Sequence, residues 1–139
     1  GGMVDGGTMA AAFALGAEGI QMGTRMVSAL ESPVHHNWKQ AIVDAPETGT
    51  VFLNKFHSPA LRALRTERTS RLEANAADNI MPEFGDAQAL YFGGDMEAAI
   101  PLSGQVAGRI ESIKPVADIL HETRDEFFRI LESLQRQYL

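Results

Sequence analysis

Two glycine-containing turns near the start of the chain constrain its fold more than any other feature. The first is Gly1-Gly2-Met3-Val4-Asp5-Gly6-Gly7, and the second is Gln21-Met22-Gly23-Thr24. An alanine-rich helix predicted over 8–15 and a short apolar strand predicted over 19–22 separate them. A helix followed by a strand carries the chain back to the same edge of a parallel sheet. Both turns are therefore expected to lie at one place.

The chemistry of these turns suits a phosphate group. Glycine removes side chains and lets backbone N–H groups converge on an anion, next to the N-terminus of the following helix. Gly23 and Thr24 add amides and a hydroxyl donor. Two tight turns that bind nothing are the alternative interpretation. Neither turn matches the Gly-Lys-Ser/Thr phosphate-binding loop of nucleoside triphosphatases or the Gly-x-Gly-x-x-Gly dinucleotide-binding motif.

Composition excludes several classes of function. Lys plus Arg number 12 against 18 Asp plus Glu, and the net charge of −6 argues against a general nucleic-acid or anionic-membrane surface, while a local basic cleft stays open. The absence of cysteine excludes disulfides and thiolate metal sites, and no apolar run reaches the roughly 18 residues of a membrane span. No spacing of histidines and carboxylates predicts a metal site. We expect a cytoplasmic protein.

The rest of the chain is predicted to be mostly helical. Asp5 or Thr8 is the expected N-cap of the first helix, and Gly16 its end. An amphipathic helix is predicted from Ser32, as N-cap, to about Pro46. Further predicted elements are a short turn at 25–30, a strand at 50–53, a basic helix at 60–75, an irregular segment at 76–86, a helix at 87–92, a helix from Asp95 to about 112, and a long amphipathic helix opened by Pro115.

Several motifs resemble one known family. Gly1-Gly2-Met3-Val4-Asp5-Gly6, the run 11–17 and Gln21-Met22-Gly23-Thr24-Arg25 resemble the C-terminal part of the nitronate monooxygenase family, which includes FMN-dependent enoyl reductases and related NAD(P)H-dependent flavin oxidoreductases. The resemblance continues through 31–35, 102–108 and 114–117, whereas 46–89 is weakly diagnostic.

This resemblance implies an α/β fold. The chain would be the C-terminal fragment of a TIM (β/α)8 barrel, with the last β/α units at 1–46 and a mostly helical extension at 47–139 that covers the flavin. A first residue inside a turn motif also suggests a piece of a longer protein. The family's catalytic histidine would lie upstream of residue 1, so the isolated chain is expected to have little or no activity.

The resemblance also implies a cofactor and substrates. The FMN phosphate would be held by Gly1, Gly2, Gln21, Met22, Gly23 and Thr24. NAD(P)H is a candidate co-substrate, and the small-molecule substrate would be a nitronate, a quinone or an enoyl thioester. A homodimer is left open. A non-catalytic phosphate- or nucleotide-binding module, and a structural helical domain with incidental glycine turns, are the rival hypotheses.

Other motifs have two interpretations each. The motif Ser103-Gly104-Gln105 has two interpretations. Its glycine allows close packing against another element, or its helix approaches the flavin so that Gln105 reaches the cleft. Tyr91, Phe92 and Met96 are core residues or the lining of an apolar substrate pocket.

The charged and histidine side chains are also ambiguous. The arginines at 62, 65, 68 and 71 predict a solvated, salt-bridged helix, with Glu67 paired to Arg71, or else one or two contacts to a nicotinamide-nucleotide or CoA phosphate. His35 and His36 are interpreted as surface or capping residues, with an active-site role as the less favoured alternative, and His121 is placed in the last helix. His57 is the histidine whose loop has the best chance of reaching a cleft, although a surface role is favoured there too.

Overall fold

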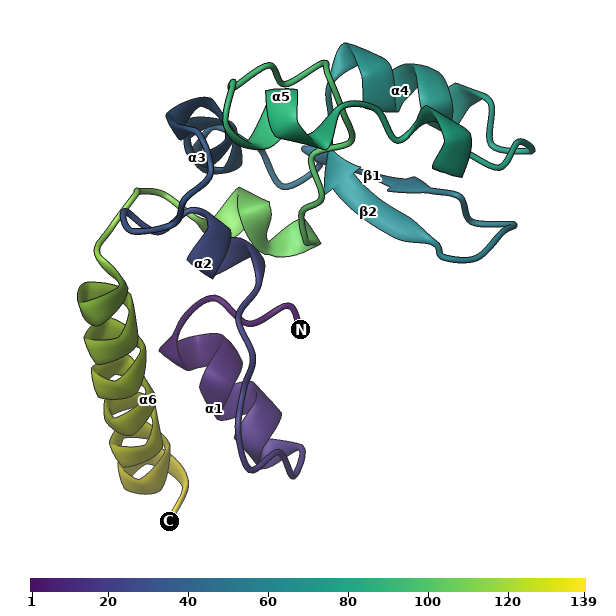
Figure 1. Cartoon of the computed structure of the whole chain (residues 1–139). Coiled ribbons are helices and arrows are strands. Elements are labelled where there is room, and N and C mark those ends of the chain that lie inside the picture. Colours follow the sequence, from purple (N-terminus) through teal and green to yellow (C-terminus); the bar gives the residue numbers. More distant parts are fainter.

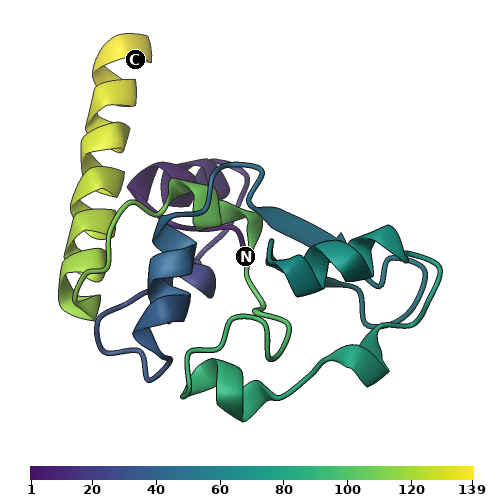
Figure 2. The same ribbon diagram turned by 90° about the horizontal axis from the view of Figure 1, so that it is seen from above.

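The computed structural model describes all residues, 1–139, as a mixed helix and strand structure (Figure 1). One part contains the first and last helices, and the other contains a β-hairpin surrounded by short helices (Figures 1 and 2). The elements are α1 (Gly6–Ala14), α2 (Thr24–Val27), α3 (His36–Val43), β1 (Thr50–Leu53), β2 (Leu61–Leu64), α4 (Glu67–Ala74), η1 (Met81–Glu83), α5 (Ala87–Tyr91), η2 (Gln105–Arg109) and α6 (Val116–Tyr138), where η marks a 3-10 helix.

Both ends of α1 are fixed by local capping. Asp5 is the N-cap, and its carboxylate accepts a hydrogen bond of 2.8 Å from the Thr8 amide, while the Thr8 hydroxyl accepts from the Asp5 amide at 3.1 Å. Gly16 follows the helix with φ of +96°. The Gly16 and Ala17 amides bond back to the carbonyls of Phe13 and Ala12, the pattern of a Schellman motif. The predicted cap and end of this helix are confirmed.

The long helix α6 packs against α1. Ile119, Thr123 and Phe127 are buried in this contact, and the rings of Phe13 and Phe127 meet edge to face at 5.1 Å. Gly6 makes the close approach feasible, because a Cβ there would lie 2.6 Å from both Glu126 Cβ and the Thr123 carbonyl oxygen. The predicted final helix is confirmed. Its apolar stripe is not buried throughout, since Leu120, Leu131 and Leu134 are 41–51% exposed.

The strand predicted at 19–22 is not formed in this structure. The segment has no assigned strand, and no backbone amide from 18 to 22 donates a hydrogen bond within the chain. A strand is defined by its pairing with a neighbour, and no neighbouring strand is present beside this segment. The turn predicted at 25–30 contains the single-turn helix α2.

The basic helix predicted at 60–75 is a strand in its first part and a helix only in its second part. Residues 61–64 form β2, which pairs antiparallel with β1 in the register Thr50↔Leu64 to Leu53↔Leu61. On the other edge of β2, Ala63 bridges Leu102, and the Leu64 amide donates to the Pro101 carbonyl at 2.9 Å. Helix α4 begins only after the Thr66 capping box. Tertiary pairing therefore overrides local helix propensity, and the extension is less helical than predicted.

Two further boundaries also differ from prediction. The helix predicted from Asp95 to 112 is reduced to η2, because residues around Pro101 pair with β2 instead of coiling. Helix α3 begins at His36, and its N-cap is His35, whose Nδ1 accepts from the Asn37 amide at 3.1 Å. Ser32 is not the cap. The helix predicted at 87–92 is confirmed as α5.

Two hydrophobic clusters form the core. One gathers Val4, Val34, Trp38, Ile42, Leu64, Leu90, Ala99, Ala107 and Ile110, and the other gathers Val51, Leu53, Ala63, Leu72, Ile80 and Ile100 under the hairpin. The first cluster joins residues on both sides of position 46, where a domain boundary was predicted, and that boundary stays a prediction. None of the helices combines the length and hydrophobicity that a membrane crossing requires.

Candidate functional site

The predicted phosphate turns leave some of their backbone amides without an acceptor, although the Val4, Asp5 and Gly6 amides are bonded. Gly2 has φ of +78°, and Gly23 is the N-cap of α2. The amides of Gly2, Gly23 and Thr24 donate to no acceptor within the chain. The N-terminal residues lie near the segment that leads into α2 (Figures 1 and 2). The two turns thus present free N–H groups, which are the donors that an oxyanion requires.

Thr24 is held by a residue far away in the sequence. The Gly104 amide donates a hydrogen bond of 2.7 Å to Thr24 Oγ1, across a separation of 80 residues. The threonine side chain acts as acceptor in this bond, so its own hydroxyl hydrogen is free to be donated to another group. Because Thr24 is 9% exposed, this bond fixes its rotamer in a largely buried setting. The bond joins the second turn to the Ser103-Gly104-Gln105 motif.

Gln105 lies next to this junction. It is the first residue of η2 and is exposed, whereas Ser103 is buried. The backbone of Gly104 passes so close to Thr24 that a Cβ at Gly104 would lie 3.0 Å from Thr24 Oγ1. The packing interpretation of this glycine is therefore confirmed. A contact between Gln105 and a flavin stays a prediction.

The N-terminus of α1 is not a free anion site. The Gly6 amide donates to Glu126 Oε2 at 2.8 Å, and the Thr8 amide donates to Asp5 Oδ1 at 2.8 Å. Two carboxylates thus occupy the positive end of the helix dipole. The expectation that the first amides of this helix point freely at the phosphate is wrong for Gly6 and Thr8, whereas the amides of Gly2, Gly7, Gly23 and Thr24 have no acceptor.

A group of charged side chains lies beside Val4 and Asp5 of the first turn. Arg25 is 7% exposed, and its Nη1 donates to Ser28 Oγ and to the Ser112 carbonyl, each at 3.0 Å. Burial lowers the pKa of this guanidinium, while the negative charge of Glu122 opposes the shift. The cation borders a cavity of about 160 Å³ that Asp5, Arg109 and Lys114 also line. These charges pair among themselves, as in Arg109 with Asp5 at 2.6 Å and Lys114 with Glu122 at 2.6 Å.

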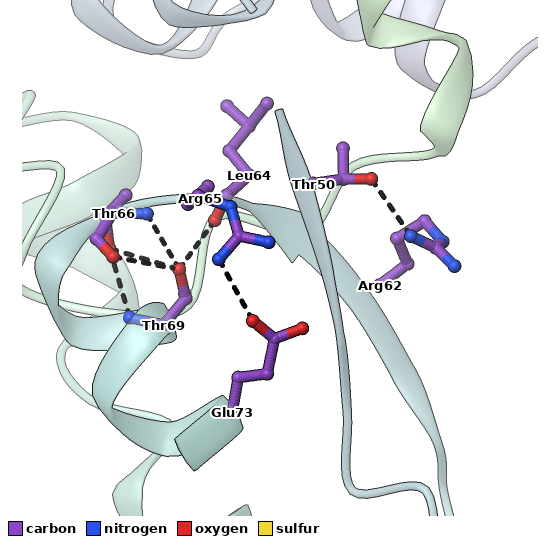
Figure 3. A network of polar contacts seen from close by, with 7 residues as sticks. All are labelled: Thr50, Arg62, Leu64, Arg65, Thr66, Thr69 and Glu73. Carbon is purple, nitrogen blue, oxygen red and sulfur yellow. Dashed lines mark hydrogen bonds and ion pairs between the residues drawn. The ribbon is translucent and has the colours of Figure 1, made fainter. Parts of the chain in front are cut away.

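The four periodic arginines have different environments. Arg65 pairs with Glu73 at 3.0 Å, and Arg71 pairs with Glu83 at 3.7 Å instead of with Glu67. Arg68 donates to the carbonyl oxygens of Glu83 and Glu97. Arg62 forms no ion pair; its Nη1 donates to Thr50 Oγ1 at 3.0 Å (Figure 3). Ion pairing is thus confirmed for Arg65 and Arg71, whereas Arg62 and Arg68 form no ion pair.

No histidine reaches the turns. His35 caps α3, and His36 is exposed in its first turn. His57 lies in the loop of the hairpin, where its Nε2 contacts the Ala77 carbonyl at 3.0 Å. His121 is exposed on α6. The structure contains no group of three or more histidines and carboxylates arranged around a metal position.

The three residues predicted to belong to the core or to line an apolar pocket, Tyr91, Phe92 and Met96, lie in different environments. Tyr91 packs edge to face on Trp38 at 4.7 Å, whereas Phe92 is 67% exposed. Met96 lines a cleft of about 480 Å³ between α3 and the start of α4, together with Ala45 and Leu64. The structure therefore does not unite these three residues in one pocket.

Two contributors to this region carried no signal in the sequence. They are the hydrogen bond from the Gly104 amide to Thr24 and the hydrogen bond from the Gly6 amide to the Glu126 carboxylate. They depend on separations of 80 and 120 residues, and no local pattern encodes them.

Comparisons with a family model and with curated proteins point to the same family. The nitronate monooxygenase family model matches residues 1–126. A probable nitronate monooxygenase of Staphylococcus saprophyticus is 34% identical over 84 residues, which is 60% of this chain and 23% of that protein. One from Staphylococcus aureus is 29% identical over 138 residues, covering 95% of this chain and 39% of that protein.

Solved structures agree with this result. FabK from Thermotoga maritima matches all of this chain with a TM-score of 0.91 and 40% identity, over 46% of its own length. A nitroalkane oxidase from Streptomyces ansochromogenes is similar in fold, with a TM-score of 0.75 and 24% identity over 96% of this chain and 40% of its own. The chain spans less than half the length of each of these proteins. From the match of the family model to most of its residues, the chain belongs to the nitronate monooxygenase family.

Proposed function

We propose that this chain is the FMN-anchoring, C-terminal part of a (β/α)8-barrel flavin oxidoreductase. The observation that carries the proposal is the set of free amides at Gly2, Gly23 and Thr24, together with the Thr24 hydroxyl that Gly104 holds in place. Turns at the ends of neighbouring barrel strands hold phosphate groups in many barrel enzymes.

The donors fit the terminal phosphate of FMN. A phosphate offers several acceptor oxygens, and uncharged amides can bind it without a buried lysine. Thr24 would donate its hydroxyl hydrogen, while Gly2, Gly23 and Thr24 would donate backbone amides. Gln21 and Met22 would contribute backbone, and Gly1 would lie adjacent. FMN supplies the redox chemistry, and this chain supplies binding and orientation.

The barrel part of the proposal explains the unpaired segment at 18–22. Its unused backbone groups are suited to pairing with parallel strands, and each relative contains a large portion that this chain does not match. On this proposal the strand predicted at 19–22 forms within the whole barrel. The catalytic groups would belong to that other portion.

The proposed reaction is the passage of an electron pair or hydride through the flavin. The electron donor would be a nitronate or NAD(P)H. The electron acceptor would be molecular oxygen, a quinone or an enoyl thioester. The residues of this chain hold the cofactor and border its site, with Gln105 next to the anchoring turn. No residue of 1–139 is assigned a proton-transfer role.

The test compares two valine variants in the full-length protein. Gly23→Val adds bulk where the phosphate would sit, yet a Cβ at Gly23 meets no atom of the chain within 4 Å. Gly19→Val is the matched control, because the same is true there and it lies in the same segment. We expect the purified wild type and Gly19→Val to be yellow with equal flavin absorbance, and Gly23→Val to lose most of its flavin.

A colourless wild-type protein that still binds inorganic phosphate would favour the non-catalytic phosphate-binding module instead. Equal flavin content in the Gly23→Val variant and the wild type would contradict the assignment of this turn.

A further inference from the structure

We infer that Arg62, supported by Phe52 and Thr50 on the hairpin, binds the phosphate of a second ligand, a phosphate-bearing co-substrate. The inference rests on the proposed function, because it places a co-substrate beside the anchored flavin. It concerns a different phosphate and a different element from the flavin turn.

Arg62 is distinguished by its missing acidic partner. Arg65 and Arg71 are neutralised by glutamates, and Arg68 is engaged by two carbonyl oxygens. The Arg62 guanidinium makes a single hydrogen bond, to an uncharged hydroxyl, so most of its N–H donors remain unused. In a chain of net charge −6, a cation without a carboxylate partner is suited to an anion from outside.

The side chain is also held in place. Its Nη1 donates to Thr50 Oγ1 at 3.0 Å, and its Cζ lies 5.6 Å from the centre of the Phe52 ring. Phe52 is paired directly with Arg62 across the two strands. An aromatic face and a hydroxyl therefore orient the guanidinium before a ligand arrives, which lowers the entropy cost of binding.

The position of Arg62 links it to the proposed flavin turn. The Ser103 amide donates to the Arg62 carbonyl at 3.0 Å, and the next residue, Gly104, donates to Thr24. Figure 3 shows Arg62 and Thr50 on the opposite side of the hairpin from Arg65, Glu73 and α4. The Arg62 carbonyl and the Thr24 hydroxyl thus accept hydrogen bonds from two consecutive backbone amides, those of Ser103 and Gly104, whereas Arg65 lies on the α4 side of the hairpin.

A phosphate is the anion that this geometry favours. A planar guanidinium with several free donors binds phosphate oxygens in a bidentate manner. The phosphate could be carried by a nicotinamide nucleotide or by the pantetheine-phosphate part of an acyl thioester. A nitronate has no phosphate and should not depend on Arg62.

The experiment measures binding of NADPH and of crotonyl-CoA to the FMN-loaded full-length protein by titration calorimetry, for the wild type, Arg62→Gln and Arg65→Gln. We expect Arg62→Gln to bind one of the two ligands about tenfold more weakly or worse, which corresponds to about 1.4 kcal/mol. Arg65→Gln, whose side chain lies on the α4 side, should bind both ligands like the wild type. The ligand whose affinity falls in Arg62→Gln identifies the source of the phosphate.

Flavin content and turnover of a phosphate-free nitronate are measured on the same samples. Wild-type flavin content with unchanged affinity for both ligands in Arg62→Gln would overturn the inference while leaving the flavin site intact. The inference is also overturned if the wild type binds neither ligand, or if Arg62→Gln loses nitronate turnover and flavin together with ligand binding. A wild type without flavin would instead refute the proposed function.

Discussion

The contact between α1 and α6 gives a sharp test, because two adjacent glycines should respond in opposite directions. A methyl group added at Gly6 would lie 2.6 Å from Glu126 Cβ and from the Thr123 carbonyl oxygen, so the backbone of α6 must move. At Gly7 the nearest atom is Asp5 Oδ1 at 3.5 Å, an ordinary contact. Overpacking typically costs about 1–3 kcal/mol, whereas replacing glycine by alanine in a helix gains up to about 1 kcal/mol.

We therefore expect Gly6→Ala to lower the free energy of unfolding and Gly7→Ala to raise it slightly. The helix gain is common to both variants, so the difference between them is the overpacking cost of about 1–3 kcal/mol. Urea denaturation followed by circular dichroism measures the difference, with m-values compared to check that the unfolding transition is unchanged. Hydrogen exchange of the α6 amides near Phe127 provides a local measurement. Equal stability and equal exchange in the two variants would refute the close-packing argument.

Three other variants test separate features. Thr24→Val leaves the Gly104 amide without its acceptor, so we expect a loss of about 1–3 kcal/mol in urea denaturation together with reduced flavin content; unchanged values of both would contradict the role of this bond. Phe127→Ala removes a 7%-exposed ring that packs on Phe13 and should cost about 3–5 kcal/mol, read as a lower denaturation midpoint. Arg65→Gln breaks an ion pair whose arginine side chain is 46% exposed and should change stability by no more than about 1 kcal/mol, so a larger loss would show that this pair is more than a surface contact.

The elements that the sequence predicts well are those with local causes. Asp5 with Thr8 and Gly16 fix the two ends of α1 through bonds that span only a few residues. The apolar period and Pro115 likewise define α6. These signals are contained within a short window, so sequence reasoning can find them.

The elements that it predicts poorly depend on distant partners. Residues 61–64 have the composition of a helix but become β2, because β1 and the segment at Leu102 offer backbone pairing on both edges. In the candidate site, the glycine turns are visible in the sequence, whereas the Gly104 bond to Thr24 and the Glu126 bond to Gly6 are not. Tertiary context decided each of these cases.

The bond between Gly104 and Thr24 also has a consequence for how such a protein can diversify. The polypeptide leaves one residue of this pair and returns to the other 80 positions later, so the bond closes the base of the intervening stretch, which also contacts the rest of the chain through Leu30 and Glu31. Changes in the length or side chains of that stretch can therefore alter what the molecule recognises without removing this hydrogen bond. Ligand recognition and cofactor anchoring thereby belong to different segments of one polypeptide.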